Sequence, residues 1–176
     1  SSTSWYQGTA DAVRKNLQHF KNNDFEYALI LSGDQLYQMD FQAVLQSHIE
    51  HSADLTVATI PVAAREASAL GIMQVNPENR ITRFVEKPKD TAVLESMKLD
   101  RATYPKLGIQ RDEDLYLASM GIYVFNRDVL FELLNNNHTD FGKHIIPGAI
   151  ENQRVYSYIF QGYWEDIGTI RSFFEA

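Results

Sequence analysis

The most constraining feature of the sequence is the unbroken apolar run Tyr27–Leu31, which ends directly in Ser32-Gly33-Asp34. A short continuous run of this kind indicates a strand buried on both faces, which is typical of parallel sheets covered by helices. Helical and strand-like segments alternate along the rest of the chain. We therefore predict an α/β fold with a Rossmann-like, mostly parallel sheet.

The other elements follow from periodicity and from breaking residues. Helices are predicted over 9–20, 41–51 and 127–134 and from 141 and 168 onward, and strands over 54–60, 116–125 and 155–160. Pro61 is expected to end the strand before it, and Asp140 to cap the helix that begins at Phe141. The runs 71–75 and 81–86 flank turn-forming residues, so they predict an antiparallel hairpin inserted into the sheet. Residues 89–114 predict a short helical patch within a charged loop.

Charge and composition exclude several classes of function. The 176 residues carry a formal net charge of −7, so the chain has no general attraction for nucleic acid or for an anionic membrane. The sequence has no cysteine, which excludes disulfides, zinc-thiolate sites and cysteine nucleophiles. It also lacks a membrane-length apolar run and a signal-peptide pattern. We expect a cytoplasmic protein, with a plastid as the alternative, and neither nucleic acid nor membrane as partner.

Asp34 and Asp166 are the candidate metal ligands. Each follows a predicted core strand and lies close to a glycine, at the sheet edge where open α/β folds bind ligands. Two carboxylates and substrate phosphates would suit Mg²⁺. Taken singly, either aspartate could equally cap a turn, and for Asp166 that simpler reading is favoured.

Two further segments contain candidate binding residues. Glu86 and Lys87 end the predicted hairpin, where they could accept from sugar hydroxyls and contact a phosphate; the alternative is a solvated ion pair. Ser119 lies inside an apolar strand, which suggests either a ligand nearby or an ordinary buried hydroxyl. The histidines match no metal motif, and His48 and His51 are expected on the solvent side of their helix.

Six segments, in the same order and at similar spacing, resemble the glucose-1-phosphate adenylyltransferase (ADP-glucose pyrophosphorylase) family. They are WYQGTADAV at 5–13, LSGDQLYQMD at 31–40, FVEKPK at 84–89, ASMGIYVF at 118–125, DFG with IIP at 140–147, and YWEDIGT at 163–169. The EKP segment is common to many sugar nucleotidyltransferases, whereas GTADA and LSGDQLY are more particular to the adenylyl, glucose-specific branch. The resemblance covers nearly the whole chain and implies a sheet of the nucleotidyltransferase type.

The resemblance implies that ATP and glucose 1-phosphate are converted to ADP-glucose and pyrophosphate, in glycogen or starch synthesis. Asp34 and Asp166 would hold Mg²⁺, and Glu86 and Lys87 would bind the glucose 1-phosphate. The remaining implied contacts are the sugar-side residues Ser119, Tyr123 and Trp164 and the nucleotide-side residues Tyr6, Gly8 and Thr9.

The family also has segments that this chain lacks. A strand and glycine-rich loop precede the Trp5 segment in the family, and a left-handed β-helix domain follows the catalytic domain. Residues 1–176 are therefore expected to be a partial, truncated catalytic domain that is inactive and poorly soluble alone. The full-length protein is expected to be a homo- or hetero-tetramer. The alternatives are a related transferase for another nucleotide or sugar, a non-catalytic regulatory subunit that binds sugar phosphate, and a plain Rossmann-like binding module.

Overall fold

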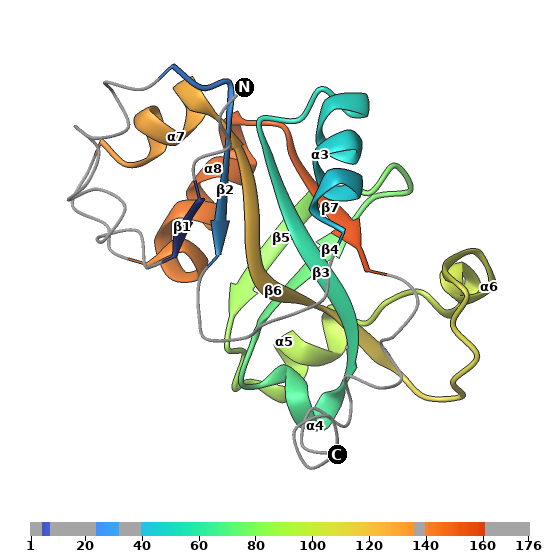
Figure 1. Cartoon of the computed structure of the whole chain (residues 1–176). Coiled ribbons are helices and arrows are strands. Elements are labelled where there is room, and N and C mark those ends of the chain that lie inside the picture. Colours follow the sequence, from blue (N-terminus) through green and yellow to red (C-terminus); the bar gives the residue numbers. More distant parts are fainter. Residues whose placement is uncertain (1–4, 8–23, 32–39, 136–139, 161–176) are drawn as a thin grey trace, which may run out of the picture.

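A mixed sheet forms the centre of the molecule, in a computed structural model that describes residues 5–7, 24–31, 40–135 and 140–160 (Figure 1). The strand order along the main path is β1-β2-β6-β3-β7, and the hairpin β4–β5 joins it through β6. The strands are β1 (Trp5–Gln7), β2 (Tyr27–Leu31), β3 (Leu55–Ala63), β4 (Gly71–Val75), β5 (Ile81–Glu86), β6 (Leu115–Asn126) and β7 (Val155–Ile159). The predicted strand within 27–31 is confirmed, whereas β1 was not predicted.

The prediction of a mostly parallel sheet is wrong for the described strands. Only β1–β2 and β3–β7 are parallel, while β6 runs antiparallel to β2, β3 and β4. An apolar run reports only that both faces of a strand are covered, and it carries no information about strand direction. β6 is as thoroughly buried as β2, although it runs the opposite way.

Pro61 does not end its strand, contrary to the prediction. β3 continues to Ala63, and Pro61 is aligned with Leu117 of β6. The parallel pairing with β7 stops at Thr59. Pro61 thus lies where β6 is the only paired neighbour of β3 among the described strands. A residue without a backbone N–H is tolerated at such a one-sided position.

The predicted hairpin is confirmed, and it is also hydrogen-bonded to the sheet. β4 and β5 pair from Gly71 opposite Glu86 to Val75 opposite Ile81. Asn79, in the connecting turn, has a φ of 67°, a conformation that asparagine adopts more readily than most residues. β4 additionally pairs with Ala118 and Leu117 of β6. This pairing fixes the position of the hairpin, and of Glu86 at its end, relative to β6.

β6 contains a bulge, which lies between the segment that pairs with β2 and the segment that pairs with β4. Val57 of β3 is opposite Tyr123 and Thr59 is opposite Ser119, so β6 advances four residues where β3 advances two. Gly121, within this bulge, has a φ of 71°. On one side of the bulge β6 pairs with β2, and on the other it pairs with β4. The bulge thus marks the point where β2 ends and the hairpin begins.

The helices lie on both faces of the sheet, as an α/β fold requires (Figure 1). Described helices are α3 (Phe41–Glu50), α4 (Ala64–Ala67), α5 (Thr91–Ser96), α6 (Tyr104–Leu107), α7 (Arg127–Leu133) and α8 (Ile146–Asn152), with a 3₁₀ turn η1 (Arg101–Thr103) and a π-helical turn η2 (Phe141–Ile145). The predicted helices near 41–51 and 127–134 and the helical patch within 89–114 are confirmed. The predicted helices over 9–20 and from 168 lie outside the described residues.

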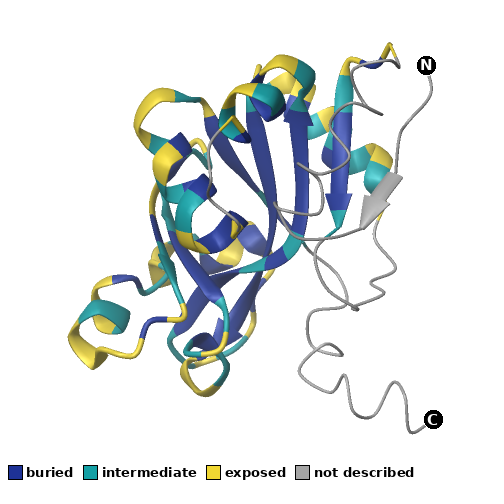
Figure 2. Cartoon of the chain, turned by 90° about the vertical axis from the view of Figure 1, so that its left-hand side faces the viewer, coloured by how far each residue is buried: buried dark blue, intermediate teal, exposed yellow. Residues whose placement is uncertain are grey.

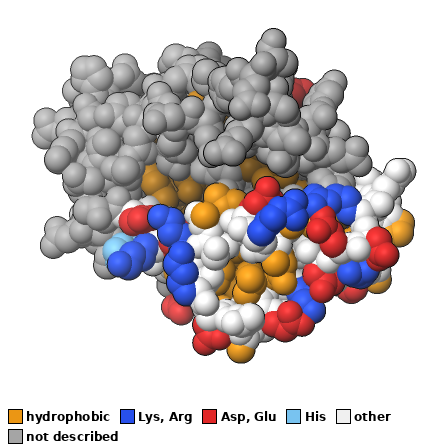
Figure 3. Space-filling model, turned by 90° about the horizontal axis from the view of Figure 1, so that it is seen from below, with side chains coloured by type: hydrophobic (Ala, Val, Ile, Leu, Met, Phe, Trp, Pro, Cys, Tyr) orange, Lys and Arg blue, Asp and Glu red, His pale blue; other side chains and the backbone are white. Residues whose placement is uncertain are grey.

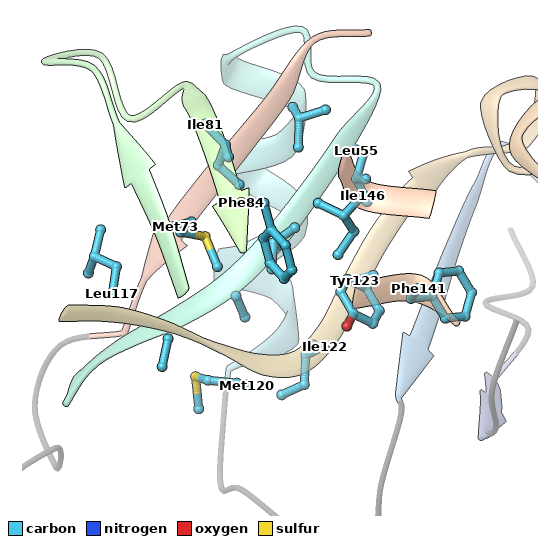
Figure 4. Packing of buried hydrophobic residues seen from close by; sticks show 14 of the residues in the cluster. Leu55, Met73, Ile81, Phe84, Leu117, Met120, Ile122, Tyr123, Phe141 and Ile146 are labelled. Carbon is cyan, nitrogen blue, oxygen red and sulfur yellow. The ribbon is translucent and has the colours of Figure 1, made fainter. Parts of the chain in front are cut away.

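The core fills the space between the sheet and these helices. β2, β3, β6 and β7 are almost entirely buried, whereas exposed residues lie on β5 and on the outer helices and turns (Figure 2). Phe84 of β5 and Ile146 of α8 point into the same cluster as Leu55 of β3 (Figure 4). No helix within the described ranges is long and apolar enough to cross a membrane.

His48 is buried, so the prediction of a solvent-side position is wrong. Its ring lies between Thr56 on β3 and Asn126 at the end of β6, with both ring nitrogens 2.7 Å from an oxygen of these residues. Tyr27 meets the ring edge-on at 5.5 Å between centroids. One polar partner lies on the strand that follows the helix and the other at the end of β6, so the helical pattern alone could not reveal them. His51 is partly buried and rests against Tyr156.

The buried His48 predicts a specific pH dependence of stability. Burial lowers the pKa of His48, and this effect outweighs the opposing influences of Asn126 and Asp54. The unfolded chain then binds more protons than the folded chain, so the free energy of unfolding must fall as the pH drops below about 6.5. We expect the wild type to lose up to about 1.4 kcal/mol per pH unit more than His48→Gln. Urea unfolding at pH 7.5, 6.5 and 5.5 measures this difference, and parallel pH profiles would contradict it.

The bulge in β6 predicts a strong preference for glycine at 121. A side chain at a φ of 71° is strained by about 1–2 kcal/mol, so Gly121→Ala should lower the free energy of unfolding by that amount. Gly121→Asn should lower the free energy of unfolding by a smaller amount, because asparagine adopts the left-handed conformation more easily. Chemical denaturation of the two variants measures both free energies of unfolding. Equal decreases would show that glycine is needed here for lack of space and not for its backbone conformation.

Candidate functional site

Glu86 is the last residue of β5, and its carboxylate lies in a notch between two glycines. Gly71 is its partner across the hairpin, and Gly142 belongs to η2. A Cβ on Gly142 would overlap the Glu86 carboxylate, and one on Gly71 would lie 3.1 Å from its Oε2. The absence of two side chains therefore creates the space that the carboxylate occupies.

The electrostatic surroundings of Glu86 are unfavourable for a charged carboxylate. Partial burial raises its pKa, the negative charge of Asp140 raises it further, and Lys87 acts in the opposite direction. Within the described part of the chain, the Glu86 carboxylate forms no hydrogen bond or ion pair. A partly desolvated carboxylate without a partner disfavours folding, and such groups are concentrated at functional sites.

Lys87 follows with an unusual backbone conformation. Its φ is 47°, a value uncommon outside glycine, and the next residue, Pro88, is buried. The backbone N–H of Lys87 donates to Leu70 O at 2.9 Å, which ties this strained residue to the start of β4. The Lys87 side chain is exposed, and no carboxylate of the described residues pairs with its ammonium. Strained, exposed cations at a strand end are candidates for binding an anion.

Ser119 lies at the start of the β6 bulge and is partly exposed. Its hydroxyl oxygen accepts a hydrogen bond from the Gly121 N–H at 3.2 Å. A hydroxyl that accepts still has one hydrogen to donate. The sequence left open whether this serine is an ordinary buried hydroxyl. Its exposure and its place at the bulge favour a position from which a ligand could be contacted.

Tyr123 is buried, and it links the sheet to η2. Its ring stacks on Phe141 with 5.2 Å between centroids, as the close view shows (Figure 4). Asp140 caps η2, as predicted, by accepting from the N–H groups of Gly142 at 2.9 Å and Lys143 at 3.1 Å. The ring stack and the cap hold Gly142 against Glu86. Tyr123 therefore lies behind the notch rather than in it.

Two strand ends reach the bulge from opposite sides. Leu31, the last residue of β2, is opposite Ile122 of β6. Ile159, the last residue of β7, is opposite Thr59 of β3, and Thr59 is in turn opposite Ser119 of β6. β2, β3 and β7 run in the same direction, because β2 and β3 are both antiparallel to β6. The carboxyl ends of β2 and β7 therefore lie at one edge of the sheet.

The predicted residues divide into three groups in the structure. The first group lies within the described residues and consists of Glu86, Lys87, Ser119 and Tyr123. Tyr6 lies in β1, of which only the backbone is described. The other candidates, which are Gly8, Thr9, Asp34, Trp164 and Asp166, lie outside the described residues.

The other charged groups nearby do not form a competing site. In the described ranges, no three His, Asp or Glu residues are close enough together to hold a metal ion. Seen from below, basic and acidic side chains are interspersed around a small apolar area (Figure 3). Lys98 pairs with Asp114 at 3.3 Å and Arg101 with Asp112 at 2.8 Å, so these cations are already neutralised. Lys87 differs from them in lacking such a partner among the residues that the structure describes.

Glu86 was a candidate from the sequence, whereas the residues that surround it were not. Asp140 was interpreted only as a helix cap, and Gly71 and Gly142 received no role. The Asp140-Phe141-Gly142 segment was already part of the family resemblance, and that is the signal that could have directed attention to it. The contact between Gly142 and Glu86 joins residues far apart in the chain, so spacing could not predict it.

A comparison with known families agrees with this arrangement. The family model described as Nucleotidyl transferase matches residues 2–176, which is almost the entire sequence. The mixed α/β sheet is consistent with such a domain. This chain therefore belongs to the nucleotidyl transferase family, whose substrates are a nucleotide and a sugar phosphate.

Proposed function

We propose that this protein transfers the adenylyl group of ATP to glucose 1-phosphate, giving ADP-glucose and pyrophosphate. Residues 1–176 would supply part of its catalytic domain. The six segments that resemble the ADP-glucose-forming family support the choice of nucleotide and sugar. The observation that carries the proposal is the adjacent pair of Glu86 and Lys87: the first is half-buried without a partner in the described part of the chain, and the second is strained and exposed.

The pair has the chemistry needed to hold a sugar phosphate. A carboxylate accepts hydrogen bonds from hydroxyl groups, and an ammonium group binds phosphate oxygens as a compact charge. Glu86 and Lys87 are consecutive, so a single ligand with hydroxyls on one side and a phosphate on the other could reach both. Ser119 would donate to the same ligand from the bulge, while Tyr123 would support the pocket from behind. Trp164 would pack near the sugar.

Asp34 and Asp166 would hold a magnesium ion at the edge of the sheet. Asp34 follows β2 by three residues and Asp166 follows β7 by seven, and the carboxyl ends of both strands lie at the β6 bulge. Two carboxylates are oxygen donors of the kind that Mg²⁺ prefers, with substrate phosphates completing its coordination. When bound, the ion would neutralise phosphate charge. Tyr6, Gly8 and Thr9 would line the nucleotide side.

The reaction requires alignment more than acid–base chemistry. A phosphate oxygen of the sugar phosphate forms a bond to the α-phosphorus of ATP, and the bond from that phosphorus to the bridging oxygen of pyrophosphate breaks. The attacking oxygen is already an anion, so no general base is needed. The protein would contribute by orienting the two substrates and by compensating their charge. Lys87 would do so at the sugar phosphate.

Substrate choice and the two aspartates provide the first test. We expect the full-length protein to use ATP and glucose 1-phosphate best among a panel of nucleoside triphosphates and sugar 1-phosphates, measured by pyrophosphate release. Asp34→Asn and Asp166→Asn should each lower kcat about 100-fold or more, because charge compensation of the reacting phosphates is lost. A preference for another pair would indicate a related transferase. Sugar-phosphate binding without turnover would indicate a regulatory subunit, and unaffected aspartate variants would favour a simple binding module.

The role of Lys87 can be tested separately from catalysis as a whole. Lys87→Gln should raise KM for glucose 1-phosphate roughly 10- to 100-fold while leaving KM for ATP nearly unchanged, because one charged hydrogen bond to phosphate is lost. Lys89→Gln is a matched control two residues away, where the ammonium donates to Ser68 O at 3.2 Å. Steady-state kinetics on both variants measure the effect. Equal changes in both KM values would remove Lys87 from the sugar-phosphate site.

A further inference from the structure

We propose that Gly142 is a positioning residue that keeps the Glu86 carboxylate in the binding site by having no side chain. The inference rests on the proposed function in taking Glu86 as a ligand-binding group. It goes beyond that function because it explains why the carboxylate stays in its notch.

Gly142 is not needed for its backbone conformation. Its φ lies outside the left-handed range, in contrast to Gly108 and Gly121. It lies within a helical turn, where glycine is less favourable than alanine by about 1 kcal/mol. An alanine here should therefore stabilise the turn if backbone preference were the only consideration. Space is the property that remains to explain a glycine.

The space beside Gly142 is filled by one group. A Cβ on Gly142 would overlap Glu86 Oε2 and would lie 2.8 Å from Glu86 Cδ, and these carboxyl atoms are its nearest neighbours. The carboxylate is the end of a flexible side chain, whereas the backbone of Gly142 is fixed. Its N–H is bonded to the Asp140 side chain, and the preceding Phe141 ring is stacked on Tyr123. When the two compete for space, Glu86 should move and Gly142 should not.

The opposite wall of the notch behaves differently. A Cβ on Gly71 would collide mainly with the ring of Phe84, which belongs to the core, and only secondarily with Glu86. Substitution at Gly71 should therefore affect folding stability first. Substitution at Gly142 should affect the carboxylate first. This difference makes Gly142 the residue that selectively controls the position of Glu86.

The kinetic test compares two single alanine variants of the full-length protein. Gly142→Ala should raise KM for glucose 1-phosphate about tenfold or more, with KM for ATP unchanged, because the displaced carboxylate no longer accepts from the sugar. Gly148→Ala is the matched control: Gly148 lies in the adjacent helix α8, and no atom of the described residues lies within 4 Å of its Cβ position. It should leave both KM values as in the wild type. An unchanged KM for glucose 1-phosphate in Gly142→Ala would overturn the proposal.

A double-variant cycle shows whether the effect passes through Glu86. In a Glu86→Ala background the carboxylate is gone, so adding Gly142→Ala should raise KM no further. The same cycle covers a failure to fold: if Gly142→Ala alone is unstable, Glu86→Ala should restore the melting temperature by removing the clash. A further tenfold loss in the Glu86→Ala background, or instability that persists there, would overturn the proposal.

A third measurement does not depend on the reaction. Carbon-13 NMR of labelled glutamate reports the pKa of Glu86, which burial and Asp140 raise and Lys87 lowers. Gly142→Ala should expel the carboxylate into water and bring this pKa back towards the ordinary value, whereas Gly148→Ala should not. If the wild type makes no ADP-glucose, the proposed function fails but this readout still tests the positioning role. A pKa that stays raised in Gly142→Ala would contradict the proposal.

Discussion

The antiparallel strand β6 is the element on which the other parts of the structure depend. It pairs with β3 along one side and, on the other, with β4 before the bulge and with β2 after it in chain order. The bulge at Ser119–Ile122 therefore determines where β2 stops and where the hairpin begins. Because β3 also carries β7, one irregularity sets the relative positions of two strand ends and of the hairpin that ends in Glu86. The pairing register of β6 thus relates candidate binding residues from distant parts of the chain.

Much of the fold could be predicted because burial leaves a direct record in the sequence. The apolar runs of β2 and β6 and the turn residues between β4 and β5 were sufficient to place these strands. Strand direction could not be predicted in the same way, since a covered antiparallel strand and a covered parallel strand have the same apolar pattern. The position of His48 was not predicted for a related reason: Thr56 lies on the next strand and Asn126 is far away in sequence, and only the folded chain brings both to its ring.

The candidate site, like the fold, has parts that the sequence indicated and parts that only the structure shows. Glu86 and Lys87 became candidates mainly through the EKP segment of the family resemblance, since their charges alone favoured a solvated ion pair, and Ser119 became one as a polar residue within an apolar strand; their binding roles stay predictions. The notch was not predictable, since a glycine whose purpose is to make room for a distant side chain looks like any other glycine. The contact of Gly142 with Glu86 is visible only after η2 has been placed against β5. Local sequence features therefore indicate which residues could bind a ligand, whereas tertiary contacts show how those residues are held in place.

The same site shows how a stable core can support unfavourable local features. The partial burial of the Glu86 carboxylate and the positive φ of Lys87 each disfavour the folded state. Backbone strain like that of Lys87 amounts to about 1–3 kcal/mol. Neither could persist on a flexible loop, which would relax to remove the strain. Both are instead fixed by ordinary structural contacts: the hairpin pairing, the Lys87 N–H bond to Leu70, and the Tyr123–Phe141 stack behind η2. In the proposed function a bound sugar phosphate would supply partners for both groups, so ligand binding should stabilise this corner of the molecule.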